Sequence, residues 1–144
     1  MKYIMLCLAV LTTFAHAAFA QQPKENWNSS QLMAPKALAD KINAHQTNNL
    51  LILGIGPAAQ IRGSVDIGPA HEAERLQKLK DYLKDVKKDK EIVIYCGCCP
   101  FDKCPNVRPA FQVLKDMGFK NARLLNLSKN LKTDWIDKDY PTQD

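Results

Sequence analysis

Four cysteines lie within nine positions of one short stretch, 96–104. Cys96, Cys98, Cys99 and Cys104 follow directly after the β-branched run "EIVIY". Thiolates act as nucleophiles, as redox partners and as ligands of soft metal ions, so this stretch carries the clearest chemistry in the chain. A disulfide within it would close only a few residues and would add little to global stability. We therefore expect the cluster to serve local chemistry.

The elements around this stretch place it at an electropositive site. The run 91–95 has the length and composition of a buried strand, and Asn106 is a natural N-cap for the periodic segment that follows. Ligands of open α/β sheets bind where a strand ends and a helix begins, and the free N–H groups of a first helical turn favour negative charge. We expect Cys96 to be the nucleophile, held there as a thiolate. The residues expected to bind its substrate are Gly97, Cys98, Cys99, Lys103, Asn106 and Arg108.

Strands and helices alternate along the rest of the chain. This alternation predicts an α/β domain with a mainly parallel central sheet flanked by helices. His71 opens a strongly charged helix, so we expect its side chain to be exposed. The expected strands are 48–56, a short one near 65–67, 91–95 and 122–126, and the expected helices are 34–45, 71–87, 106–117 and a short one in the tail.

These segments resemble a known family. "IVIYC", the loop after it, the helix ending in "LKDMGF" and the strand "NARLLN" are similar to the active-site half of a rhodanese domain. The tail "DWIDKDYP" is similar to the Trp-containing C-terminal segment of that family, and the resemblance spans about residues 34–141. It implies a rhodanese-like fold and sulfurtransferase activity, in which a cysteine takes up sulfane sulfur as a persulfide and passes it to a thiophilic acceptor. By position that cysteine is Cys96, on a loop longer than most family members have.

Other roles for the cluster stay open. Cys98, Cys99 or Cys104 can serve as a resolving thiol or pair in a small disulfide. The alternative functions are an exported thiol–disulfide or soft-metal-binding protein, and a non-catalytic rhodanese-fold binding module. The spacing C-x-C-C-x4-C lacks the paired C-x2-C of structural zinc sites, so no metal ligand is predicted. "GIGPAA" at 54–59 is interpreted as a glycine-rich turn, and no cofactor is predicted.

The first twenty residues have the pattern of a secretory signal peptide. Lys2 precedes a short apolar stretch that ends in Ala18-Phe19-Ala20, a small-residue cleavage pattern. We therefore expect a signal peptide at 1–20, an N-terminal arm at 21–33 and the domain at 34–144. The predicted location is periplasmic or secreted, without a stable membrane anchor after cleavage.

The distribution of charge along the chain indicates which partners to expect. The formal net charge is +5, but the lysines are interleaved with aspartates and apolar residues, as on a solvated helix face. Nucleic acid is therefore not an expected partner. We expect a monomer whose partners are a small sulfur-containing anion and a thiol acceptor, either a protein or a low-molecular-weight thiol.

Overall fold

The computed structural model describes residues 26–57 and 59–143, and the predicted signal peptide lies outside them. Within this part of the chain, five parallel strands form one sheet in the order β1-β5-β4-β2-β3. The sheet confirms the predicted α/β class with parallel strands. The strands are β1 (Leu32–Met33), β2 (Leu50–Gly54), β3 (Ser64–Asp66), β4 (Glu91–Tyr95) and β5 (Ala122–Leu125).

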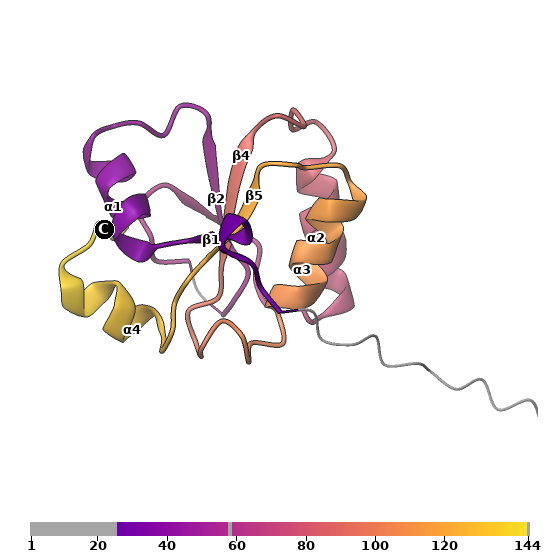
Figure 1. Ribbon diagram of the computed structural model, residues 1–144. Helices are drawn as coiled ribbons and strands as arrows, with labels where there is room; N and C mark the ends of the chain where they lie inside the picture. The colour runs from indigo at the N-terminus through magenta and orange to yellow at the C-terminus, as the bar shows by residue number, and fades with distance from the viewer. Residues whose placement is uncertain (1–25, 58, 144) are drawn as a thin grey trace, which may run out of the picture.

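Helices cover both faces of this sheet (Figure 1). The helices α2 and α3 lie together on one face, and α1 and α4 lie on the other. Each face has its own hydrophobic core, one built around α2 and α3 and one around α1 and Trp135. The helices are α1 (Pro35–Asn43), α2 (Ala73–Leu83), α3 (Val107–Asp116) and α4 (Leu131–Asp134), with 3-10 turns η1 (Ser29–Gln31) and η2 (Ile136–Lys138).

The central strand and the helix after it fix the position of the cysteine stretch. In β4, every residue after Glu91 is buried, as expected for a strand with neighbours on both sides and helices on both faces. On α3, Ala110, Phe111 and Leu114 turn one apolar stripe toward the sheet. The helix stops at Gly118, whose φ of +82° is the left-handed conformation that glycine adopts most readily. The β4–loop–α3 unit is thus anchored in the core at both ends.

The segment expected to be an arm contributes to the fold. Its end forms η1 and β1, and β1 pairs with β5 through Leu32 with Leu124 and Met33 with Leu125. Ahead of it, the Trp27 ring meets the Phe111 ring edge-on at 4.9 Å between centroids. A two-residue strand is too short to show periodicity, so the sequence pattern did not reveal that the sheet begins before residue 34.

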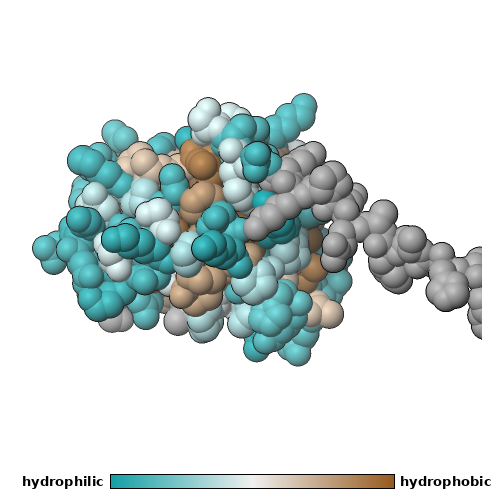
Figure 2. Space-filling model, turned by 60° about the horizontal axis from the view of Figure 1, so that its bottom comes forward, coloured by the Kyte–Doolittle hydropathy of each residue, from teal (hydrophilic) through white to brown (hydrophobic). Residues whose placement is uncertain are grey.

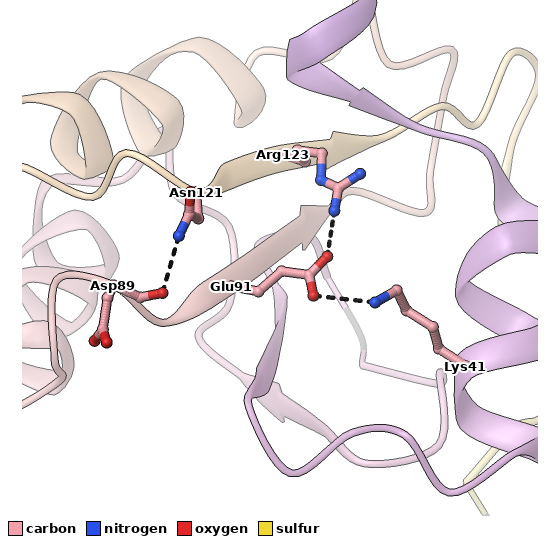
Figure 3. A network of polar contacts seen from close by, with 5 residues as sticks. All are labelled: Lys41, Asp89, Glu91, Asn121 and Arg123. Atoms are coloured by element: carbon pink, nitrogen blue, oxygen red, sulfur yellow. Dashed lines mark hydrogen bonds and ion pairs between the residues drawn. The ribbon is translucent and has the colours of Figure 1, made fainter.

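Polar contacts hold the amino ends of the strands together (Figure 3). Glu91 at the start of β4 accepts from Lys41 Nζ of α1 at 3.1 Å and from the Arg123 guanidinium of β5. Beside it, Asn121 Nδ2 donates to the Asp89 carbonyl oxygen at 2.9 Å. In the described part of the chain, no helix combines the length and apolar character needed to cross a bilayer.

Candidate functional site

The cysteine loop begins at the carboxyl end of the central strand. Cys96 directly follows β4, and Gly56 follows the neighbouring β2 on the same edge of the sheet. Figure 2 turns this end of the molecule toward the viewer and shows patches of hydrophobic residues among hydrophilic ones. The loop therefore lies where ligands bind in parallel α/β sheets, as the sequence predicts.

The loop folds its four cysteines into one cluster. All four Sγ atoms, from Cys96, Cys98, Cys99 and Cys104, lie within 4.8 Å of one another. The Sγ of Cys98 is 3.4 Å from that of Cys96 and 3.2 Å from that of Cys99, and all four are free thiols. Cys96 and Cys104 are buried, whereas Cys99 is half-buried and Cys98 is exposed. We call these residues the thiol cluster, with a buried floor and an open rim.

Asn106 ties the floor of the thiol cluster to a neighbouring segment. Its Nδ2 donates to Cys96 Sγ at 3.3 Å and to Cys104 Sγ at 3.7 Å. Its Oδ1 accepts from the His71 backbone N–H at 3.0 Å and lies 2.7 Å from His71 Nδ1. An amide oxygen only accepts hydrogen bonds, so this contact requires the proton on His71 Nδ1.

Asn106 stands at the N-cap position of α3, as predicted, but its side chain makes no capping bond. The amide is used for the two sulfurs instead. His71 is exposed, as expected for the start of a charged segment, yet it contacts Asn106 with its backbone and its ring. Asn106 was predicted as a site residue, whereas the contribution of His71 was missed.

These contacts separate the cysteines by acidity. The hydrogen bond from Cys104 lowers the pKa of Cys96 to about 5, helped by the Asn106 amide and by Cys98, although burial opposes the shift. Burial raises the pKa of Cys98 to about 12, and the neighbouring Cys99 and Cys96 thiols add to the shift. The pKa of Cys104 rises well above its ordinary value, chiefly because its thiol donates to Cys96. Cys96 is therefore the thiolate of the cluster, and Cys104 is a proton donor to it.

Two close packing contacts restrict the shape of the loop. A Cβ on Gly97 would lie 2.9 Å from Leu131 Cβ, and the Gly97 carbonyl accepts from the Leu131 N–H at 3.0 Å. A Cβ on Gly56 would lie 3.0 Å from Cys96 Sγ. Gly56 and Leu131 were not predicted as site residues. Gly56 could have been found from the pairing of β2 with β4, because both strands end at the same edge.

The two predicted cationic residues differ in their surroundings. The Arg108 guanidinium lies over the Trp27 ring, 5.2 Å from its centroid, on the first turn of α3. Lys103 is exposed on the loop. Of the predicted site residues, the structure therefore brings together the four cysteines and Asn106, with Gly97 beside them, whereas Arg108 contacts an aromatic ring.

Comparison with solved structures decides the fold. The single-domain sulfurtransferase RDL2 of Saccharomyces cerevisiae matches at a TM-score of 0.52 and 14% identity, over 79% of this chain and 94% of its own. A variant of EanB in complex with hercynine matches at a TM-score of 0.53 and 14% identity, over 81% of this chain and 29% of its own. The chain has a rhodanese-like fold. SseA of Escherichia coli, a 3-mercaptopyruvate sulfotransferase described with the "rhodanese" fold, matches at a TM-score of 0.47 and 17% identity, over 69% of this chain and 41% of its own.

Sequence comparison adds no closer relative. The chain matches no family model, and no curated protein matches it. It spans about a third of the length of EanB and nearly all of RDL2. The rhodanese-like resemblance seen in the sequence is thus confirmed as a fold.

Proposed function

We propose that this protein is a sulfurtransferase that carries sulfane sulfur as a persulfide on Cys96. The observation that supports this proposal best is the environment of Cys96 Sγ. It is buried at the end of the central strand, accepts from the Asn106 amide and has a pKa of about 5. A thiolate stabilised in this way is a ready nucleophile at neutral pH. The rhodanese-like fold, shared with the sulfurtransferase RDL2, supports the same chemistry.

The first step loads the sulfur. The Cys96 thiolate attacks the outer sulfur of a sulfane-sulfur anion such as thiosulfate. A new S–S bond forms, the old S–S bond breaks, and sulfite leaves with its electron pair. The protein then holds a persulfide anion on Cys96. The hydrogen-bond donors that stabilise the thiolate are placed to stabilise the persulfide anion as well, and Asn106 Nδ2 lies 3.3 Å from Cys96 Sγ.

The second step passes the sulfur on. The thiolate of an acceptor attacks the outer sulfur of the persulfide, and Cys96 leaves as a thiolate. The low pKa of Cys96 favours this departure, because a weakly basic thiolate is a better leaving group. The acceptor is a protein thiol or a low-molecular-weight thiol. We further propose that the protein acts as an exported monomer.

Mass spectrometry of the intact protein tests the proposal. Chelator-treated, reduced protein is incubated with thiosulfate or with a polysulfide, and the spectrum is recorded without reducing agent. We expect one added sulfur atom per chain, which a thiol acceptor then removes. The Cys96→Ser variant takes up none.

The matched control is Cys99→Ser, which changes a neighbouring thiol and leaves Cys96 and Asn106 in place. It should still take up one sulfur atom. Uptake that persists in Cys96→Ser, or no uptake by the unchanged protein from either donor, would contradict the assignment of Cys96 as the sulfur carrier.

A further inference from the structure

We propose that the thiol cluster also binds a single thiophilic metal ion of the Zn(II) type, with Cys96, Cys98, Cys99 and Cys104 as its four ligands. This inference does not depend on sulfur transfer. It starts from the convergence of the four sulfurs, which lie within 4.8 Å of one another although their spacing in the sequence is not that of a zinc knuckle. Four thiolates in a tetrahedral arrangement favour Zn(II) over hard cations.

The distances fit such an ion. With Zn–S bonds of about 2.3 Å, the ligand sulfurs of a tetrahedral site stand about 3.8 Å apart. The Sγ atoms of Cys96 and Cys98 are 3.4 Å apart, those of Cys98 and Cys99 are 3.2 Å apart, and no pair exceeds 4.8 Å. The two shorter distances thus lie within about 0.6 Å of the tetrahedral spacing, and no pair exceeds it by more than about 1 Å. Side-chain rotations on the loop would have to absorb that difference when the ion binds.

The burial pattern places two of the ligand cysteines in the interior and two toward the solvent. Cys96 and Cys104 are 2% and 4% exposed and form the floor, whereas Cys98 is exposed and Cys99 half-buried at the rim. An ion arriving from solvent therefore meets the rim first. The rim is also held in place, because the Leu131 N–H donates to the Gly97 carbonyl at 3.0 Å.

The two buried sulfurs accept hydrogen bonds of the kind that orient thiolate ligands around a metal ion. Asn106 Nδ2 donates to both buried sulfurs, and Asn106 Oδ1 is fixed in turn by the His71 backbone and ring. Donors behind the ligands orient them and disperse their negative charge. Binding replaces the protons of the thiols by the metal, so each protonated thiol that coordinates releases one proton. No electron is transferred, and no other reactant is needed.

Metal binding and sulfur loading would compete for Cys96. A sulfur coordinated to the ion no longer offers a free thiolate, so the loaded protein should take up no sulfane sulfur. This consequence depends on the proposed function, but the binding itself does not. Zn(II) would then hold the nucleophile in a protected form until a chelator or a competing thiol removes the ion.

The test is a titration of reduced, full-length protein with Zn(II) under anaerobic conditions, repeated with Co(II) as a spectroscopic probe. We expect one equivalent of Zn(II) per chain and the intense visible and charge-transfer bands of tetrahedral cobalt with sulfur ligands. Cys99→Ser should lower the affinity by at least about 100-fold, and Asn106→Ala by about 10–100-fold. His45→Ala, which changes an exposed histidine far from the cluster in sequence, should leave the affinity unchanged.

The outcomes separate this inference from the proposed function. Less than one equivalent of tightly bound Zn(II), or binding that Cys99→Ser leaves unchanged, would overturn the metal site even if sulfur uptake is normal. Conversely, Zn(II) binding by protein whose metal-free, chelator-treated form takes up no sulfur would support the metal site and contradict the sulfurtransferase. Circular dichroism of Cys99→Ser shows whether a loss of binding comes from a loss of folding.

Discussion

The two ends of the central strand arrange their ionisable groups in opposite ways. At the amino end, the Glu91 carboxylate lies between the cations of Lys41 and Arg123, so opposite charges face one another. At the carboxyl end, four groups of one kind face one another, and the Asn106 amide is shared between two of them. At the amino end, the Glu91 carboxylate is thus already paired with cations of the protein itself.

The second arrangement drives the acidities of neighbouring thiols apart. The hydrogen bond from Cys104 lowers the pKa of Cys96 to about 5, whereas burial raises the pKa of Cys98 to about 12. Groups with strongly separated pKa values inside one cluster are typical of functional sites. The comparison teaches that the amino end joins the strands through opposite charges, whereas the carboxyl end gathers thiols of different acidity, as the proposed chemistry needs.

The largest expected effect is in the acid titration of the thiols. The thiolate absorbance of chelator-treated protein should show one ionisation near pH 5, from Cys96, while Cys98 stays protonated to about pH 12. Because the pKa of Cys96 is lowered in the fold, its thiolate is present above that pH and is lost as the pH falls through about 5. Sulfur uptake should fall with it, by about tenfold per pH unit below that point.

The control for this titration is Cys96→Ser, which should lack the acid step. A first ionisation near the ordinary pKa of a thiol in the unchanged protein would remove the contrast between the two ends of the sheet.

The next effect comes from removing the shared amide. In Asn106→Ala the two buried sulfurs lose the amide donor that they share, so the pKa of Cys96 should rise and the protein should lose about 1–3 kcal/mol of unfolding free energy. The same titration, together with a denaturant melt, measures both quantities.

The matched variant is Asn121→Ala at the amino end, where the side chain donates to the Asp89 carbonyl and is exposed. It should leave the acid step unchanged. If both variants shift the acid step equally, the Asn106 contact has no special role in the acidity of Cys96.

A smaller effect is expected from adding one methyl group beside the sulfur. In Gly56→Ala the new Cβ would lie 3.0 Å from Cys96 Sγ, so the sulfur must move. We expect a loss of about 1 kcal/mol in stability and slower sulfur uptake. Gly54→Ala is the control, because its Cβ would meet Ala59 and the Tyr95 hydroxyl instead. Equal slowing in both variants would indicate a general distortion of the sheet edge.

The smallest effect is expected at the amino end. Glu91→Gln removes the charge that pairs with Lys41 and Arg123, but both cations are partly exposed, so the cost should be at most about 1 kcal/mol. Sulfur uptake should not change. Thermal melting and the mass-spectrometric assay check the two statements, and a fall in uptake would show that the two ends are coupled.

Much of the fold could be predicted because its patterns are local. The helix expected at 34–45 is α1, the buried run at 91–95 is β4, and the periodicity before Gly118 is α3. Apolar periodicity and glycine stops are properties of neighbouring residues, so one sequence is enough to read them.

The site was predicted in part because its contacts join distant segments. Cys96 and Asn106 stood out by type and position, but the Asn106 amide reaches across to His71, and the Gly97 backbone packs on Leu131. Such contacts depend on how the segments pack, which spacing along the chain does not reveal. In the same way, the spacing of the cysteines argued against a metal site, whereas the loop brings the four sulfurs together.

The contacts between the cysteine loop and the stretch 127–131, which leads into α4, have a consequence for engineering. The Phe101 N–H donates to the Leu127 carbonyl at 3.1 Å, and Leu131 packs on Gly97, so the loop takes its shape from a stretch that follows it by more than twenty residues. Mutant libraries meant to change the donor or acceptor of the proposed sulfur transfer should therefore vary 127–131 together with the loop itself.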